Sequence, residues 1–193
     1  MVRAMSNALR KPLTLSEFLA WEETQPLKYE FDGLSPMAMT GVSAAHAALQ
    51  VNLITSLRTR LRGSPCRPFG SDLKIEVAGR IRYPDAFVAC TPVAAGATVV
   101  KDPVVVFEIL SDATAHIDHG AKNREYEATP SIRRYVIFEQ DAMAATIFAR
   151  EGKEWLGRML TGPDAILDLP EIGLHIPLAE LYADIDLVAP ALV

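Results

Sequence analysis

The segment VVVFEIL, residues 104–110, begins with three β-branched valines and contains one acidic residue, Glu108, among its apolar residues. β-Branched side chains favour strands, and a short, nearly continuous apolar run is typical of a strand buried on both faces. We therefore expect a central strand here. Side chains alternate along a strand, so Glu108 shares a face with Val104, Val106 and Leu110. A buried charge is costly unless a partner compensates it, so the sequence predicts a partner for Glu108.

A second carboxylate opens the strand predicted in YPDAFVAC, residues 83–90. Asp85 follows Pro84, a residue type found at strand starts and edges. If this strand neighbours residues 104–110, Asp85 and Glu108 point at one spot. Two close carboxylates cannot both stay ionised without a cation or a shared proton, and Mg²⁺ prefers carboxylate oxygens. The alternative is structural: an arginine across the sheet pairs with Glu108, and Asp85 caps a turn.

Local signals predict the elements of the first half. Thr14 and Glu17 form a capping box that predicts a short helix, and Asp32-Gly33 predicts a hairpin turn. Residues 43–62, SAAHAALQVNLITSLRTRLR, carry the longest helical pattern. The apolar stripe expected to face the core runs through Ala44, Ala47, Val51, Ile54, Leu57 and Leu61.

The chain after residue 70 is rich in strands. A turn at Ala78-Gly79 separates the strands predicted in SDLKIEV and RIRYPDAFVAC. Helices are expected in DHGAKNREYEAT, before Pro130, and in PLAELYADI. A buried strand is predicted in RRYVIFEQ, and a hairpin in AATIFAR and EWLGRML around Glu151-Gly152. This order predicts an α/β (α+β) fold with one central mixed β-sheet flanked by helices, in a single domain over residues 1–193.

Composition fits a soluble globular protein, with 193 residues of which 50% are hydrophobic and 22% charged. No apolar run approaches the roughly 20 residues that span a bilayer. The N-terminus lacks the continuous apolar stretch of a signal peptide. Cys66 and Cys90 show no metal-site spacing, so we predict reduced thiols in a cytoplasmic protein without membrane contact.

The formal net charge of -5 argues against a strong nonspecific nucleic-acid binder, because such binders neutralise many phosphates. A local basic patch is still compatible with this charge. Arginines cluster near the end of the long predicted helix. A solvated helix end is the simpler interpretation of this cluster, which consists of Arg58, Arg60, Arg62 and Arg67.

The segments YPDAFVAC, VVFEILS, DHGAKNREYEA and RRYVIFE, in this order, resemble the Uma-two family of the PD-(D/E)xK nuclease superfamily. Upstream, LTLSEFLAWEE, KYEFDGLSPMAM and HAALQVNLITSLRTRL resemble the family's opening helix, its hairpin and its long helix. The resemblance covers about residues 13–185. It implies a restriction-endonuclease-like fold with that core.

The resemblance also implies a metal site. By position, Asp85 and Glu108 match the carboxylates that bind Mg²⁺, for which Mn²⁺ is the expected substitute. The backbone carbonyl of Ile109 matches a further ligand. The superfamily pattern places a lysine two residues after Glu108, where this chain has Leu110. Lys122 matches a lysine moved to the following helix.

Glu30 matches an additional acidic residue of the catalytic group, which would then comprise Asp85, Glu108, Lys122 and Glu30. Structural alternatives stand beside these roles. Lys122 has the helical spacing to pair with Asp118 or Glu125 on a solvated surface. Glu30 can form a cross-strand pair with Lys28 or Arg82, and His46 either packs or borders the site.

The leading hypothesis is therefore a Mg²⁺-dependent endonuclease that hydrolyses phosphodiester bonds of DNA. The alternative is a non-catalytic protein of the same fold that acts as a DNA-binding or dimerisation module, which Leu110 and the acidic net charge favour. A nuclease acting on RNA or single strands has less support, because no aromatic-rich stacking platform is evident. A homodimer is consistent with the prevalence of symmetric dimers among oligomers.

Overall fold

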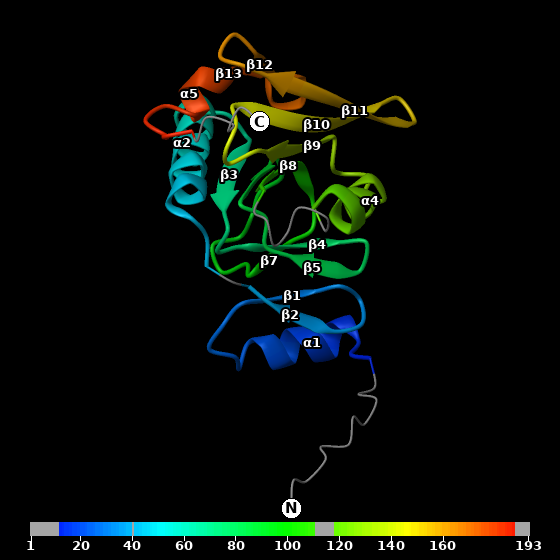
Figure 1. Ribbon diagram of the computed structural model, residues 1–193. Coiled ribbons are helices and arrows are strands. Elements are labelled where there is room, and N and C mark those ends of the chain that lie inside the picture. Colours follow the sequence, from blue (N-terminus) through cyan, green and yellow to red (C-terminus); the bar gives the residue numbers. More distant parts are fainter. Residues whose placement is uncertain (1–11, 40, 111–117, 188–193) are drawn as a thin grey trace, which may run out of the picture.

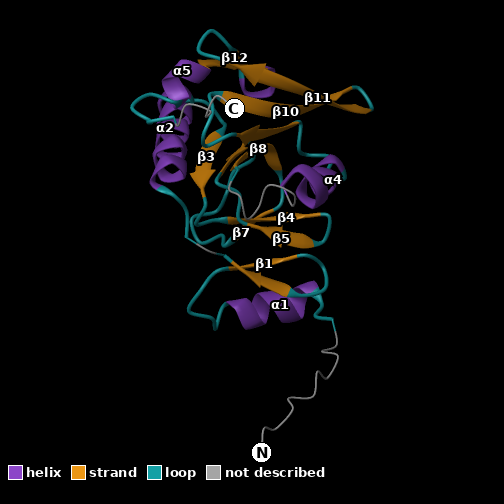
Figure 2. Ribbon diagram, in the orientation of Figure 1, coloured by secondary structure: helices purple, strands orange, loops and turns teal. Residues whose placement is uncertain are grey.

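The computed structural model describes residues 12–39, 41–110 and 118–187. Its strands form three sheets, where the sequence predicted one. Figure 1 shows helix α1 and the β1–β2 hairpin at one end, strands β4, β5 and β7 in the middle, and the largest sheet toward the other end. The elements nevertheless give the mixed α+β fold that was predicted, as the colouring by secondary structure shows (Figure 2).

The six-stranded sheet has the order β11-β10-β9-β8-β6-β3. Strand β8 (Pro103–Ile109) lies between β6 (Ala86–Ala89), which is antiparallel to it, and β9 (Arg134–Phe138), which is parallel. The predicted central strand and its mixed surroundings are thus confirmed. The remaining strands of this sheet are β3 (Arg67–Gly70), β10 (Ala144–Glu151) and β11 (Glu154–Thr161).

The five-stranded sheet has the order β2-β1-β5-β4-β7. Its strands are β1 (Tyr29–Phe31), β2 (Pro36–Ala38), β4 (Lys74–Val77), β5 (Arg80–Arg82) and β7 (Val99–Val100). The segment RIRYPDAFVAC was predicted as one strand but forms β5 in this sheet and β6 in the other. Pro84 stands between them, and its missing N–H cannot join a ladder.

Helix α1 (Leu15–Glu22) begins with the predicted capping box, in which Thr14 and Glu17 exchange hydrogen bonds. Its buried Phe18 stacks on Phe31 of β1 with ring centroids 4.8 Å apart. This contact fastens the helix to the five-stranded sheet.

Helix α2 (Ala44–Arg60) packs through a face that shares Leu57 and Leu61 with the predicted stripe but leaves Ala44, Ala47 and Val51 exposed. Leu49, Leu53 and Leu57 are fully buried, whereas the side chain of Val51 is 62% exposed. Both sets have helical spacing, but leucines remove more apolar area from water than alanines do. The leucines therefore determine which face meets the six-stranded sheet.

After the undescribed stretch 111–117, a π-helical turn η1 (Asp118–Lys122) leads into α4 (Asn123–Glu127), so the predicted helix before Pro130 is present. The structure adds a small sheet that the sequence analysis missed. It contains β12 (Ile166–Leu169) and β13 (Leu174–Pro177), joined by η2 (Pro170–Ile172) and followed by α5 (Leu178–Leu181).

Cys66 and Cys90 form a disulfide, so the prediction of two reduced thiols is wrong. Cys66 directly precedes β3 and Cys90 directly follows β6. Arg67 pairs with Ala89 across these antiparallel strands, which places the two cysteines side by side. Among the helices of the described residues, none is long and apolar enough to cross a membrane.

The buried face of α2 can be tested with a matched pair of substitutions. Leu53→Ala should lower the free energy of unfolding by about 2–5 kcal/mol, because it leaves a cavity in the core. Val51→Ala, on the exposed face, should change it by less than about 0.5 kcal/mol. Urea unfolding of both variants measures the difference. Equal losses would mean that α2 packs through the stripe first expected.

Candidate active site

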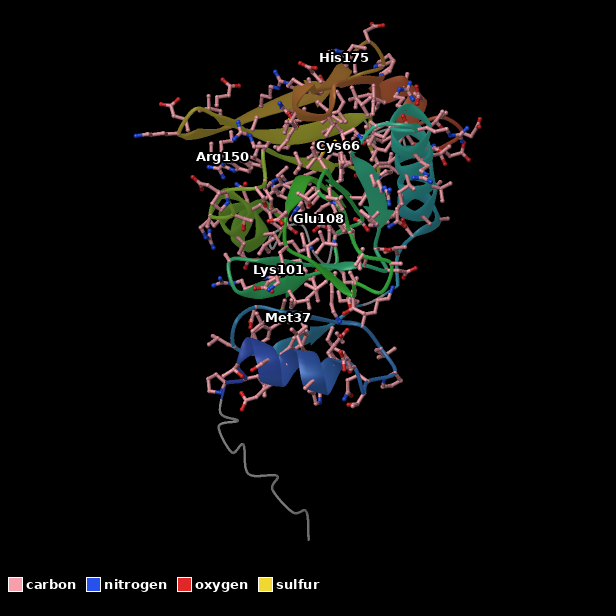
Figure 3. All side chains as sticks on the ribbon, turned by 180° about the vertical axis from the view of Figure 1, so that it is seen from behind. Met37, Cys66, Lys101, Glu108, Arg150 and His175 are labelled. Atoms are coloured by element: carbon pink, nitrogen blue, oxygen red, sulfur yellow. A yellow bond between two sulfur atoms is a disulfide. The ribbon has the colours of Figure 1, made fainter. Side chains whose placement is uncertain are left out.

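The buried charged groups of the predicted site meet where the two large sheets face each other. Glu108 comes from β8 of the six-stranded sheet, Glu30 from β1 of the five-stranded sheet, and Lys122 from the turn before α4. Figure 3 shows Glu108 near the middle of the molecule, between the two sheets. Elements distant in sequence thus bring these side chains together.

Glu108 and Lys122 form a direct ion pair, with Nζ of Lys122 2.8 Å from Oε1 of Glu108. Both residues are buried, at 4% and 5% exposure. The hydroxyl of Tyr126 also donates to Oε1, at 3.1 Å. The solvated-surface alternative for Lys122 is therefore wrong, and Glu108 has a buried lysine as a charge partner.

Tyr126 keeps its proton in this position. Complete burial, and then the negative charge of Glu108, raise the pKa of the phenol well above its ordinary value. Its hydroxyl is therefore a hydrogen-bond donor to Glu108 at any ordinary pH. Tyr126 lies four residues after Lys122, so both side chains project from one face of the helical segment toward the same carboxylate.

Asp85 lies beside Glu108 on the neighbouring strand. The register pairs Ala86 with Phe107, and extending it by one residue places Asp85 opposite Glu108 on the same face. Oδ2 of Asp85 accepts the backbone N–H of Ile109 at 2.7 Å, and Oδ1 lies 2.8 Å from Nε2 of His46. Asp85 thus does not cap a turn but is held next to the strand that carries Glu108.

His46 borders the site, as one of the two sequence interpretations proposed. It lies in the first turn of α2, where the hydroxyl of Ser43 accepts its backbone N–H. The ring is 4% exposed, and its Nδ1 has no hydrogen-bond partner within the described residues. Because Nε2 faces a carboxylate, which only accepts hydrogen bonds, Nε2 is the donor in this contact. Gln50, one turn on, donates to the backbone carbonyl of Asp85 at 2.8 Å.

Glu30 forms the predicted pair with Arg82 and also lies close to Lys122. It accepts hydrogen bonds from Nη1 of Arg82 at 3.2 Å and from the backbone N–H of Tyr83 at 3.0 Å. The expected pairing with Arg82 is confirmed. Oε1 of Glu30 also lies 3.6 Å from Nζ of Lys122, so this carboxylate belongs to the same cluster.

Arg82 and Glu125 complete the cluster, and the sequence analysis assigned neither to the site. Two nitrogens of Arg82 donate to the two oxygens of Glu125, at 2.8 and 2.7 Å. Burial alone would lower the pKa of Arg82, but Glu125 and Glu30 raise it, so the guanidinium stays charged. In the sequence, Glu125 is one of several acidic residues in a short helix and Arg82 is one of two arginines before Pro84. Neither pattern is specific enough to assign these residues to a site.

The donor set was tested for its fit to a metal ion. No group of three or more His, Cys, Asp or Glu residues suited to a metal occurs within the described residues. Mg²⁺ is usually held by only one or two protein carboxylates and keeps several waters. Asp85 and Glu108 lie side by side on neighbouring strands, and Lys122 pairs with Glu108. Two carboxylates beside one ammonium group leave one negative charge in excess. Hard oxygen donors with excess negative charge fit such an ion.

Leu110 departs from the superfamily pattern in structure as well as in sequence. It is buried in an apolar cluster that also contains Val106 and Tyr126. The amine that lies beside Glu108 in this chain is that of Lys122. The metal-binding role of Asp85, Glu108 and the Ile109 carbonyl, and the catalytic role of all four predicted residues, stay predictions.

Comparison with known proteins relates this chain to a family of putative nucleases. Residues 15–179 match the Uma2 family, described as "Putative restriction endonuclease". The chain is 31% identical over 174 residues to the uncharacterized protein slr1290 of Synechocystis sp., covering 88% of this chain and 91% of that protein. It is 27% identical over 170 residues to the uncharacterized protein sll1609 of the same organism, covering 85% and 96%.

A solved structure has the same fold. It is described as a putative nuclease belonging to DUF820 from Anabaena variabilis, and it superposes with a TM-score of 0.75 at 18% sequence identity. The match covers 89% of this chain and 98% of that one. The restriction-endonuclease-like fold expected from the sequence is thereby confirmed.

The contact between His46 and Asp85 can be tested by two substitutions of different polarity. His46→Leu should lower the free energy of unfolding by about 1–3 kcal/mol, because it leaves a largely buried carboxylate oxygen without its donor. His46→Gln should lose less, since its side-chain amide can donate toward the same oxygen. Urea unfolding at neutral pH compares them. Equal stability of the leucine variant and the wild type would show that the contact contributes nothing.

Proposed function

This chain belongs to the Uma2 family, and from that membership and the geometry of the site we propose that it is a Mg²⁺-dependent endonuclease acting on DNA. One observation carries the proposal: the buried amine of Lys122 lies 2.8 Å from Glu108, which neighbours Asp85 across the sheet. Two adjacent carboxylates and a lysine are the groups that metal-assisted hydrolysis of a phosphodiester requires.

Asp85, Glu108 and the backbone carbonyl of Ile109 would hold the metal ion. Mg²⁺, or Mn²⁺ in its place, would polarise a phosphate oxygen and lower the pKa of a bound water. The protein fixes Asp85 through the backbone N–H of Ile109 and the ring of His46. This fixation keeps the carboxylate oriented before any ligand arrives, so little reorganisation is needed at the site.

Lys122 would stabilise the negative charge that develops on the phosphate during hydrolysis. A lysine amine is a compact cationic charge suited to this task, and its effect is strong where water is excluded. Glu108 at 2.8 Å and Glu30 at 3.6 Å keep the amine in place. Glu30 is therefore proposed to position Lys122 by its charge.

A non-catalytic nuclease-fold protein is the second candidate. It is favoured by the extent to which the site is satisfied internally: both oxygens of Asp85 and Oε1 of Glu108 have partners within the protein. In that case the cluster would serve to join the two sheets, and the chain would act as a DNA-binding or dimerisation module. Homodimer formation and a cytoplasmic location stay predictions under either candidate.

Titration with Mn²⁺ by calorimetry tests the metal site. The wild type should bind Mn²⁺, and Asp85→Asn and Glu108→Gln should each weaken binding by more than about tenfold. Loss of a residue that only supports a metal ligand already weakens metal binding by about tenfold or more, so loss of a ligand should cost at least as much. Glu76→Gln, on β4 and paired with Lys101, is the control that should bind as the wild type does. A wild type that binds no Mn²⁺ would contradict the proposed function.

Lys122→Met separates catalysis from metal binding. It should retain Mn²⁺ binding but slow DNA cleavage by about 10²–10³-fold, the usual effect of removing one group that stabilises the transition state. Nicking of supercoiled plasmid in Mn²⁺ measures the rate, with Lys101→Met at an exposed site as control. A wild type that binds Mn²⁺ but leaves DNA of every tested form intact would favour the non-catalytic candidate.

A further inference from the structure

A cleft of about 390 Å³ opens beside the segment that carries Lys122. One wall is a stripe of the helical segment formed by η1 and α4, in which Ala121, Arg124 and Ala128 follow at helical spacing. The opposite wall comes from the five-stranded sheet and includes Arg80 and Arg82. The cleft therefore lies between the helical segment that carries Lys122 and the five-stranded sheet that carries Glu30.

The charges that line the cleft leave a surplus of one cation. Arg80, Arg82 and Arg124 face Glu125 and Asp32 there. Both oxygens of Glu125 accept from Arg82, and Nε of Arg80 lies 3.1 Å from Oε1 of Glu125. Glu125 is thus fully occupied, and its charge is offset by two guanidinium groups.

The carboxylate of Asp32 accepts hydrogen bonds from the backbone of its own turn. Its Oδ1 accepts the backbone N–H groups of Leu34 and Ser35, both at 2.8 Å. Slight burial opposes ionisation, but these backbone bonds lower the pKa of Asp32 below its ordinary value. The negative charge of Asp32 is therefore satisfied locally, as that of Glu125 is by the arginines.

Arg124 supplies the available cation. It is exposed, and its guanidinium makes no hydrogen bond or ion pair with any described residue. Arginine offers a planar fork of donors that matches phosphate oxygens. Met37, Ala121 and Ala128 add an apolar lining suited to the sugar between phosphates. An anion of single charge would find both charge and shape complementarity here.

A chain of net charge -5 needs a local cationic surface to hold a polyanion. The other basic cluster lies at the end of α2, where Arg60 is already paired with Glu180. Arg60 is 14 residues from His46 along this helix, which at 1.5 Å per residue is about 21 Å from the site. Arg124 is only two residues from Lys122.

We propose that this cleft binds a phosphate of the DNA backbone next to the bond that is cleaved, with Arg124 as the residue that contacts it. The inference rests on the proposed nuclease function and adds to it the place where the substrate backbone is held. Arg82 also lines the cleft, but its donors and its charge are engaged with Glu125 and Glu30.

The test compares Arg124 with an equally exposed arginine of the other basic cluster. Binding of a fluorescein-labelled DNA duplex is measured by fluorescence anisotropy over a range of salt concentrations, with metal chelated so that the duplex stays intact and again in Mn²⁺ with a phosphorothioate-substituted duplex. Arg124→Ala and Arg124→Glu are compared with Arg58→Ala and Arg58→Glu. Thermal unfolding and Mn²⁺ titration of each variant check that fold and metal site are intact.

Arg124→Ala should reduce the slope of log affinity against log salt by about 0.9, the value for one lost phosphate contact. Arg124→Glu should weaken binding further, while the Arg58 variants stay close to the wild type. Loss of binding in the Arg58 variants alone, or equal losses at both positions, would overturn the assignment of the cleft and leave the nuclease proposal standing. A wild type that binds Mn²⁺ but no duplex in either condition would overturn the proposed DNA substrate together with the cleft.

Discussion

The two large sheets are joined through buried charges, and this constraint governs the rest of the structure. A chain of contacts runs from Glu108 to Lys122, then to Glu30, Arg82 and Glu125. These residues come from both sheets and from the helical segment between them, so the network determines how the three bodies meet. Charges taken out of water lose solvation that their mutual attraction only partly restores. Replacing buried ion pairs by well-packed apolar residues is often neutral or stabilising, so stability alone does not explain the charges at this junction.

Much of the fold could be predicted because its signals are local. The capping box at Thr14, the turns at Gly33 and Gly79, and the β-branched run of β8 each depend on neighbouring residues only. The errors concern long-range choices. Both faces of α2 carry apolar residues at helical spacing, and only the packed structure shows that the leucines are inside. The disulfide depends on the register of β3 against β6, which no sequence pattern specifies.

In the candidate site, too, the features set by local sequence could be predicted, and those set by long-range packing could not. Alternation along β8 predicted an inward carboxylate at Glu108, and the structure has it 4% exposed. That Asp85 adjoins it required the pairing of β6 with β8. Lys122 was identified through a family resemblance, because an isolated lysine on a short polar helix does not indicate its own orientation. His46 was left between two interpretations for the same reason: a single polar residue on a helix with small neighbours gives no periodicity from which its face can be read.

The exchange of lysine for Leu110 follows from how the site is built. Positions 108 and 110 share a face of β8, so a lysine at 110 would lie beside Glu108 on the same strand. In this chain that face is packed around Leu110, Val106 and Tyr126, which anchor the helical segment against the sheet. Lys122 lies one helical turn before Tyr126 in this segment, and both side chains contact Oε1 of Glu108. A π-helical turn ends at Lys122, and such turns are frequent at functional sites. Apolar packing at Leu110 is therefore compatible with an amine beside Glu108, because that packing holds the helical segment from which Lys122 projects.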